Sequence, residues 1–468
     1  MSAAAPALAA EPGAQPRRSL VLAGGGMRVA YQAGVLLALE EAGIGFAHAD
    51  GTSGGTINLA MLLSGVSPTE MCERWRTLSV RDFGSPLPLH EYLNATHLPA
   101  LGDADGIVEK VFPHLGIDVD RIKASRGLDA TFNACNYTRK TNEAVPHTDV
   151  DLDLLVAGIS LPIYMPPVRR GSDLYTDSVW IKDANLTEAV RRGSDEIWLV
   201  WCIGNTGIYR NGAFNQYVHM IELAANGSLF EEFDRIRELN ETREPPVRLH
   251  VVRPEFPIPL DPDFYLGRID GEALLELGYA DTKRYLASMS GDGIPWTPEA
   301  TRMRDPVPGV SFRETMTGKL DGEEITISPR VRVRDLDAFV EGPAREGEVT
   351  GYVEFAPLDG RAIVGGGRFS MQGDAAEYAL TFERDGRQYS ITARKNLHDD
   401  FGPDLWHDIT TVSVTLAEDG RALASGSLRS DVSKLVRSVQ AWDVESEAER
   451  ITATARFGTF FLGSSRDG

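Results

Sequence analysis

Two patterns of hydrophobic and polar positions divide the chain. From residue 19 to about residue 290, short apolar runs of strand length alternate with longer segments whose apolar residues recur at helical spacing. This alternation is typical of an α/β domain with a parallel sheet. From about residue 311 to the end, hydrophobic and polar residues alternate with a period of two, which predicts antiparallel strands. We therefore expect an α/β domain followed by an antiparallel all-β domain, either a barrel or a sandwich.

The α/β region opens with a strand and three helices. Residues 20–23 read as a short buried strand, and the spacing of apolar residues predicts a helix over 30–42. A second apolar helix is expected after Ser53 and ends at Gly65, and a third begins at Pro68.

Later parts of this region are less regular. Residues 152–159 and 196–203 are apolar runs that we interpret as buried strands. Between residues 81 and 120 the pattern is interrupted by Pro, Gly and His residues, and only short helices are expected. A segment of this kind near a nucleophile forms either part of a lid or pocket wall, or a surface connection, and the sequence favours neither.

Composition places the borders of these regions. Residues 1–18 are rich in Ala and Pro, and two arginines follow their small apolar patch, which predicts a disordered tail and not a signal peptide. Residues 291–310 are polar and proline-rich, as is typical of a linker. We therefore predict an α/β domain over 19–290 and an all-β domain over 311–468. In the second domain, Asp-Gly pairs predict tight turns at 321–322, 359–360, 385–386 and 419–420.

Charge and cysteine content exclude several classes of function. The formal net charge is −21, so the chain lacks the excess of cations that nucleic acid or a strongly anionic membrane attracts. The three cysteines, Cys72, Cys135 and Cys202, are far apart and include no CxxC pair. We expect reduced thiols, a cytoplasmic protein, no metal ion and no cofactor. No segment reads as a membrane span, and a peripheral contact with membranes is left open.

Two glycine-rich turns carry the candidate chemistry. In the run 51–55, Gly-Thr-Ser-Gly-Gly, Ser53 stands between glycines at i−2 and i+2, as in a sharp strand-to-helix turn that exposes a nucleophile. Gly24-Gly25-Gly26 follows the first predicted strand, about one helix and one strand upstream of Ser53. In a parallel sheet, both turns would lie at the carboxyl edge, where active sites form.

A serine nucleophile needs donors for the oxyanion and a base. The N–H groups of Gly25, Gly26 and Gly54 are natural oxyanion donors, and Arg28 either adds positive charge or anchors the glycine loop. A dinucleotide fingerprint is the competing interpretation of this loop, but it would need glycine at position 29, where Val29 stands.

The candidate base is a carboxylate. No histidine lies in a recognisable catalytic motif, and we interpret His48 and His147 as surface or loop residues. Asp177 lies after a proline-rich stretch, with Asp173 and Asp183 as nearby competitors.

Together these features resemble the patatin-like phospholipases over residues 19–290. The resemblance rests on the loop 24–28 with residues 31–36 behind it, the turn 51–55, the stretch 158–168 with Met165 in the family's aromatic position, and Gly278-Tyr279 followed by Asp281. It implies a three-layer α/β/α sandwich and a lipid acyl hydrolase that uses a Ser–Asp dyad without histidine or cofactor. The substrate would be a lipid or another ester.

The family's roles transfer residue by residue. Ser53 is the implied nucleophile and Asp177 the implied base. The implied oxyanion loop and its surroundings are formed by Gly24, Gly25, Gly26 and Gly54, with Arg28 in support and Gly51 and Gly55 in the elbow.

Two positions depart from the family's pattern. Val29 follows the basic residue of the loop where the family usually has glycine, and Ser178-Val179 replace the Gly-Gly or Gly-Ala that usually follows the aspartate. If that turn requires a positive φ, a serine there would be strained by on the order of 1 kcal/mol. The alternative hypothesis is therefore a lipid-binding or scaffolding protein of the same fold without turnover.

The C-terminal region has a resemblance of its own. Residues 399–406 and 455–458 resemble β-rich segments appended to bacterial cholesterol-oxidase-like flavoproteins. This implies an accessory domain for apolar or sterol-like ligands, without a catalytic role. Recruitment of a partner or a membrane by this region is a further hypothesis.

Overall fold

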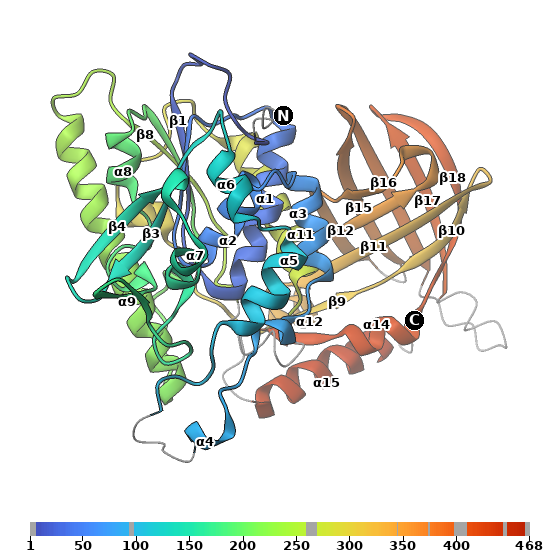
Figure 1. Cartoon of the computed structure of the whole chain (residues 1–468). Coiled ribbons are helices and arrows are strands. Elements are labelled where there is room, and N and C mark those ends of the chain that lie inside the picture. Colours follow the sequence, from blue (N-terminus) through green and yellow to red (C-terminus); the bar gives the residue numbers. More distant parts are fainter. Residues whose placement is uncertain are drawn as a thin grey trace. The chain divides into compact units, whose positions relative to one another are not determined.

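The computed structural model describes residues 6–92, 98–258, 269–343, 345–372, 375–396, 410–442 and 447–463. The chain divides into two compact units, Met1–Asp305 and Pro306–Gly468, which are described separately (Figure 1). Among the described residues, no helix has both the length and the apolar character needed to cross a bilayer.

The first unit is built on a mixed sheet in the order β5-β6-β3-β2-β1-β7-β8, with β4 paired to β3. The central strands run parallel, whereas β4, β5 and β6 are joined by antiparallel pairings. The parallel strands are β1 (Arg18–Leu22), β2 (His48–Gly51), β3 (Asp129–Asn136), β7 (Glu196–Val200) and β8 (Arg248–Val252). The others are β4 (Thr141–Pro146), β5 (Val168–Arg170) and β6 (Asp173–Thr176).

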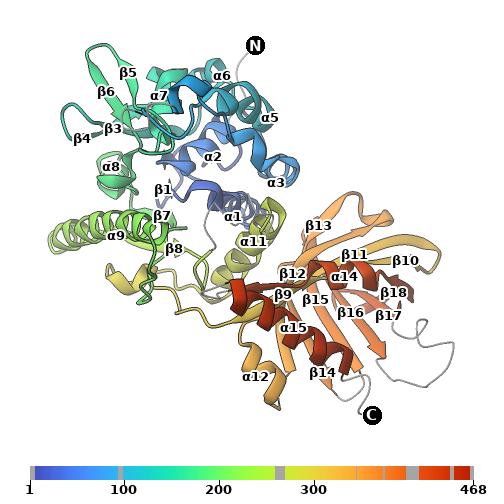
Figure 2. The ribbon, with the colours of Figure 1, turned by 90° about the horizontal axis from the view of Figure 1, so that it is seen from below.

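Helices cover both faces of this sheet, which gives the expected three layers (Figure 2). On one side lie α8 (Leu186–Arg191) and α9 (Ala213–Asn240). On the other lie α1 (Ala30–Glu41), α2 (Gly54–Leu63), α3 (Pro68–Thr77) and α11 (Gly271–Ser288). The central strands are therefore buried on both faces, which explains their continuous apolar sequences.

Two glycines allow α1 and α11 to pack closely. A Cβ atom at Gly34 would lie 1.9 Å from Leu275 O, and one at Gly278 would lie 2.0 Å from Tyr31 O. Such contacts cannot be relieved by side-chain movement because the obstructing atoms belong to the backbone. The helices are also joined by the Tyr31 hydroxyl, which donates to Asp281 Oδ2 at 3.1 Å.

Residues 152–159 form a helix, α7 (Leu152–Ile159), so the predicted strand is wrong. Asp151 caps this helix by accepting a hydrogen bond from the Leu154 N–H at 2.8 Å. Leu155 and Ile159, one helical turn apart, are both buried. A continuous apolar run does not reveal its period, and here the N-terminal cap was the usable signal. The second predicted strand is shorter than expected and ends at Val200.

The N-terminal segment, predicted as a tail, makes specific contacts where it is described. Ala9 forms a β-bridge with Phe46, whose N–H donates to Leu8 O at 2.7 Å. Leu8 is 8% exposed and Phe46 is fully buried. The contact partner is distant in sequence, so composition alone does not indicate it.

The region predicted as a linker, 291–310, also contains packed residues. Pro298–Thr301 form a short 3₁₀ helix, and the ring of Trp296 packs edge-to-face on Phe233 with 5.7 Å between ring centroids. The division between the two units, after Asp305, falls inside this region.

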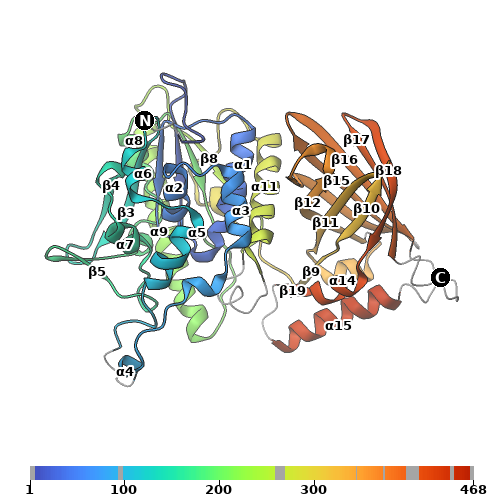
Figure 3. The same ribbon diagram turned by 45° about the vertical axis from the view of Figure 1, so that its right-hand side comes forward.

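The second unit contains a closed ring of antiparallel strands (Figure 3). β11 pairs with both β10 and β12, and the path β12-β14-β15-β16-β17-β18-β10 returns to β11, so the described strands form a barrel. The ring strands are β10 (Met316–Leu320), β11 (Glu323–Val333), β12 (Arg345–Phe355), β14 (Gly366–Gln372), β15 (Ala375–Arg384), β16 (Arg387–Asn396), β17 (Thr411–Glu418) and β18 (Arg421–Ser430). β13 (Arg361–Ile363), β9 (Gly309–Arg313) and β19 (Gln440–Trp442) extend the pairing.

The predicted Asp-Gly turns are present in the second unit. Both residues of each pair have a positive φ, which matches the tight turns that Asp-Gly favours. Three of the four pairs join consecutive ring strands directly, and the fourth precedes β13. The described residues of the unit also include the α-helices α12 (Leu336–Glu341), α14 (Val432–Ser438) and α15 (Glu447–Gly463).

The described core of the second unit is mainly aromatic and aliphatic, and it contains the ion pair of Lys395 with Glu314. Phe312 and Phe369 pack edge-to-face with 5.8 Å between centroids. Lys395 Nζ lies 2.8 Å from Glu314 Oε1, and both side chains are 1% exposed. The hydroxyl of Tyr378 also donates to Glu314. The stretch 399–406 lies outside the described residues. Residues 455–458, which the sequence likened to a β-rich segment, lie in the helix α15 and not in a strand. The resemblance to cholesterol-oxidase-like segments stays a prediction.

Candidate active site

The turn between β2 and α2 holds Ser53 in an unusual backbone conformation. Its φ is 52° and its ψ is −130°, a region that non-glycine residues rarely occupy. Only glycine fits at position 55, since a Cβ atom there would lie 2.1 Å from Leu22 O. The sharp turn and the small neighbour place Ser53 at the carboxyl edge of β2, as the sequence predicts.

Ser53 lies directly against Asp177. The Ser53 hydroxyl donates to Asp177 Oδ2 at 2.6 Å, and the Val179 N–H donates to Asp177 Oδ1 at 2.9 Å. Asp177 is 1% exposed. Burial raises the pKa of Asp177 to about 6, against the opposing effect of these two hydrogen bonds. The carboxylate is therefore ionised at neutral pH but is more basic than an ordinary aspartate.

The glycine loop after β1 approaches the same serine. A Cβ at Gly24 would lie 2.8 Å from Ser53 Cβ and 2.3 Å from Asp183 Oδ1. The Gly24 N–H donates to the carboxylate of Asp183, with 3.2 Å to each oxygen. Gly25 and Gly26 line the cavity beside Ser53.

Gly54 and Arg28 complete the surroundings of the serine. Gly54 is the first residue of α2, so its N–H belongs to those at a helix start that have no acceptor within the helix. Arg28 is 6% exposed, and its Nε donates to Gly25 O at 3.0 Å. Arg28 thus anchors the loop and also lines the cavity.

The departures from the family pattern cause no backbone strain. Val29 has a φ of −68°, an ordinary helical value. Neither Ser178 nor Val179 has a positive φ. The strain expected from a serine after the aspartate is therefore absent.

Ser53 and Asp177 lie in the wall of a cavity of about 500 Å³. Its described lining is mainly apolar and includes the ionisable residues Arg28, Asp103 and Asp177. The segment 81–120 contributes a wall of this cavity, which settles the alternative left open by the sequence; its lining residues include Phe83, Pro86, Leu101 and Ile107. Further apolar residues come from the loop after α7 and from α9, among them Leu161, Tyr164, Met165, Phe214 and Val218.

Comparison with known proteins agrees with this geometry. Residues 20–190 match the family model described as "Patatin-like phospholipase". These residues belong to a patatin-like α/β domain. The match begins in β1 and ends in α8, and it includes both Ser53 and Asp177. A search of curated proteins found no match.

Solved structures similar to this chain include bacterial effectors. VipD from Legionella pneumophila is 12% identical over 58% of this chain and 67% of that chain, with a TM-score of 0.33. The type III effector ExoU is 14% identical over 57% of this chain and 53% of that chain, with a TM-score of 0.25. Full-length ExoU from the Pseudomonas aeruginosa type III secretion system, in complex with SpcU, is 18% identical over 58% of this chain and 53% of that chain, with a TM-score of 0.23. The matched region thus spans about half of ExoU.

His48 is buried in a strand, so its interpretation as a surface or loop residue is wrong. His147 is also buried, but it begins the short 3₁₀ helix His147–Asp149 that connects β4 to α7, so only surface exposure is wrong for it. His48 is fully buried in β2, where Nδ1 contacts Ser19 Oγ at 3.0 Å and Nε2 contacts Thr131 Oγ1 at 3.1 Å. Burial lowers the pKa of His48 to about 4. His147 is 7% exposed. Neither residue is part of the cavity lining.

The competing carboxylates of the patatin-like domain have other partners. Asp173 accepts from Asn136 Nδ2 at 2.9 Å and pairs with Arg139 at 2.8 Å. Asp183 is fully buried and lies against Gly24. The sequence indicated only that Asp183 is close to Asp177 along the chain. Burial and the charge of Asp177 raise the pKa of Asp183 to about 8. The cysteines are free and buried, and no group of three or more potential metal ligands occurs among the described residues.

Proposed function

We propose that the protein is a serine acyl hydrolase that cleaves lipid esters with the dyad Ser53–Asp177. The observation that carries this proposal is the 2.6 Å hydrogen bond from Ser53 Oγ to the buried carboxyl group of Asp177 at the wall of an apolar cavity. A cavity of about 500 Å³ lies within the range of small-molecule sites and can enclose an acyl chain. The patatin-like domain is the family-level support for this activity.

The proposed reaction proceeds through an acyl-enzyme. Ser53 Oγ attacks the ester carbonyl while its proton passes to Asp177 Oδ2. The tetrahedral oxyanion is held by N–H groups, and collapse expels the alcohol, which takes the proton back from Asp177. A water molecule then gives its proton to Asp177 and attacks the acyl-serine. The fatty acid leaves, and the proton returns to Ser53.

We assign the oxyanion donors to Gly25, Gly26 and Gly54. Each of these residues lines the cavity with Ser53. Gly24 receives a different role, because its N–H already donates to Asp183. Its lack of a side chain lets the loop approach both Ser53 and Asp183. Loss of one oxyanion donor in comparable sites costs roughly 10²–10³ in rate.

A peripheral contact with a lipid surface belongs to the same proposal. Leu101, Tyr164 and Phe214 line the cavity and are also exposed, by 53%, 36% and 39% respectively. Ile163 is 56% exposed, has a φ of 77°, and accepts a hydrogen bond from the Leu101 N–H at 2.8 Å. A β-branched residue with a positive φ is strained. Exposed apolar residues beside an apolar cavity suit contact with lipid. Phospholipase A or lysophospholipase activity is the finer form of the proposal.

Labelling with a fluorophosphonate probe tests the proposed function. The wild-type protein should be labelled at Ser53, and Ser53→Ala should be unlabelled and should lose hydrolysis of a p-nitrophenyl ester. Ser172→Ala is the matched control, because Ser172 is exposed on the turn between β5 and β6. Unlabelled wild-type protein that still binds a fatty acid would refute the enzyme and favour the lipid-binding alternative.

A further inference from the structure

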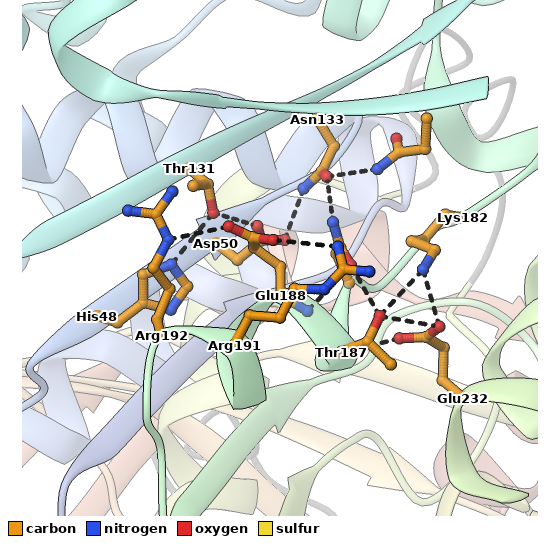
Figure 4. A network of polar contacts seen from close by, with 12 residues as sticks. His48, Asp50, Thr131, Asn133, Lys182, Thr187, Glu188, Arg191, Arg192 and Glu232 are labelled. Carbon is orange, nitrogen blue, oxygen red and sulfur yellow. Dashed lines mark hydrogen bonds and ion pairs between the residues drawn. The ribbon is translucent and has the colours of Figure 1, made fainter. Parts of the chain in front are cut away.

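A buried polar network links β2 to β3, and Figure 4 labels Asp50, Thr131 and Asn133 in it. Its centre is Asn133, in the middle of β3 and 1% exposed. Asn133 Nδ2 donates to Asp50 Oδ1 at 2.6 Å and to Gly51 O at 3.2 Å. Asn133 Oδ1 accepts from Asn142 Nδ2 and from Asn185 Nδ2, both at 2.8 Å. Both N–H donors and both acceptor positions of this amide are therefore in use.

One end of the network holds the nucleophile turn. Asp50 is the residue before Gly51, and Gly51 begins the turn that carries Ser53. Asp50 is fully buried, and its second carboxylate oxygen accepts a hydrogen bond from the Thr131 hydroxyl, which comes from the same strand as Asn133. The last residues of β2 are thus tied to β3 by side chains as well as by the sheet.

The other end reaches the loop of the base. Asn142 of β4 accepts a hydrogen bond from the Ser178 hydroxyl, and Ser178 is the residue after Asp177. Ser178 is fully buried. A third branch runs through Asn185, whose side chain caps α8 by accepting from the Glu188 N–H at 3.3 Å. One amide therefore connects the nucleophile turn, the base loop and the start of the following helix.

We propose that Asn133 is a positioning residue that sets the separation of Ser53 and Asp177 through Asn142 and Ser178. The inference rests on the proposed function of the dyad. Ser53 and Asp177 belong to separate turns, and a misplacement of about 1 Å between reacting groups can cost about 10²-fold in rate.

The chemistry of the network explains which residue types it needs. A carboxylate at position 133 could not donate to Asp50, and an apolar residue could neither donate nor accept. Ser178 supplies the hydroxyl that reaches Asn142, and glycine, the family's usual residue at this position, has none. The departure at Ser178 is thus part of the positioning device of this chain.

Separate measurement of kcat and KM with a p-nitrophenyl ester tests the inference. Ser178→Ala should lower kcat about 10-fold or more and leave KM within about twofold, because the cavity wall is unchanged. Ser178→Gly should lower kcat at least as much, although it restores the family's residue. In Asn142→Asp, one carboxylate oxygen can still accept from Ser178, but the other replaces the Nδ2 donor and faces Asn133 Oδ1. Because these two oxygens repel each other, this variant should also lower kcat.

Tyr175→Phe is the matched control. Tyr175 lies in β6 two residues before Asp177, and its hydroxyl donates to Glu143 outside the network. This variant should keep the wild-type kcat. The inference is overturned if wild-type protein is active while Ser178→Ala and Asn142→Asp retain kcat within about twofold, or if their loss of kcat matches that of Tyr175→Phe. Unlabelled wild-type protein would instead overturn the proposed function.

Discussion

Replacement of Asp177 by asparagine should stop turnover and at the same time stabilise the fold at neutral pH. Burial raises the pKa of Asp177 from its ordinary 3.8 to about 6, so the folded protein binds this proton more tightly than the unfolded chain does. The stabilisation by the protonated carboxyl is complete below about pH 4 and is lost as pH rises through about 6. A difference of about two pH units, at about 1.4 kcal/mol for each, makes the ionised carboxylate cost about 3 kcal/mol at pH 7.5.

Asparagine removes this cost and keeps the size of the side chain. Its amide can donate to Ser53 Oγ, and its oxygen can accept from the Val179 N–H, so both observed contacts can be preserved. The expected gain at pH 7.5 corresponds to a rise of the thermal midpoint on the order of 5 °C. At pH 4 most of the gain should be lost, because the wild-type carboxyl is then protonated in the folded protein and about half protonated in the unfolded chain.

Thermal melts of wild type and Asp177→Asn at pH 7.5 and pH 4 measure this effect. The change with pH in the difference between the two proteins reports on position 177, because the other titrating groups are common to both. Asp173→Asn is the control of opposite sign, because a hydrogen bond from Asn136 and the charge of Arg139 lower the pKa of Asp173. That variant should not stabilise the protein at pH 7.5. An Asp177→Asn protein no more stable than wild type at pH 7.5, or equally stabilised at both pH values, would refute the reasoning.

Three further predictions concern pH, packing and charge. The kcat/KM of ester hydrolysis should fall about tenfold for each pH unit below about pH 6, because protonated Asp177 cannot accept the serine proton, and a flat profile down to pH 4.5 would contradict this. Gly34→Ala should lower the thermal midpoint because its Cβ would meet Leu275 O at 1.9 Å, whereas Gly227→Ala, with open space in α9, should raise stability by about 0.5–1 kcal/mol. Lys395→Met should destabilise the second unit by about 3–5 kcal/mol, because the buried Glu314 loses its positively charged partner. The double variant Lys395→Met with Glu314→Gln should recover much of this loss in the same melts.

The elements that the sequence predicts well are those with a local signal. The strand at 20–23 is a short apolar run that ends at a glycine loop, the helix at 30–42 is too long an apolar segment for a strand, and the Asp-Gly turns require only two residues each. The helix at 152–159 has no readable period because nearly all of its residues are apolar, and its Asp151 cap is a single side chain. Barrel closure depends on the pairing of β11 with β12, which alternation of polar and apolar residues does not specify.

For the site too, features set by residues close in sequence could be predicted, and contacts between residues far apart in sequence could not. The turn around Ser53 has a motif because glycine is needed on both sides of the serine. The contact of Gly24 with Asp183 spans 159 positions, and that of Asn133 with Asp50 spans 83. Asn133 is a polar residue inside a strand, where one sequence does not distinguish a network residue from an exposed one. Family resemblance located Asp177, but it does not reveal what surrounds that carboxylate.

The surroundings separate the roles of the three carboxylates near the site. Asp173 pairs with Arg139, so its charge is compensated away from the serine. Asp177 and Asp183 are both buried, and the charge of Asp177 helps to raise the pKa of Asp183 to about 8, whereas that of Asp177 is about 6. Asp177 is therefore the more acidic of the two, and Asp183 holds its proton more tightly. Two buried carboxyl groups whose pKa values are driven apart favour a division of labour, with the ionised one as base and the neutral one as a partner of the glycine loop.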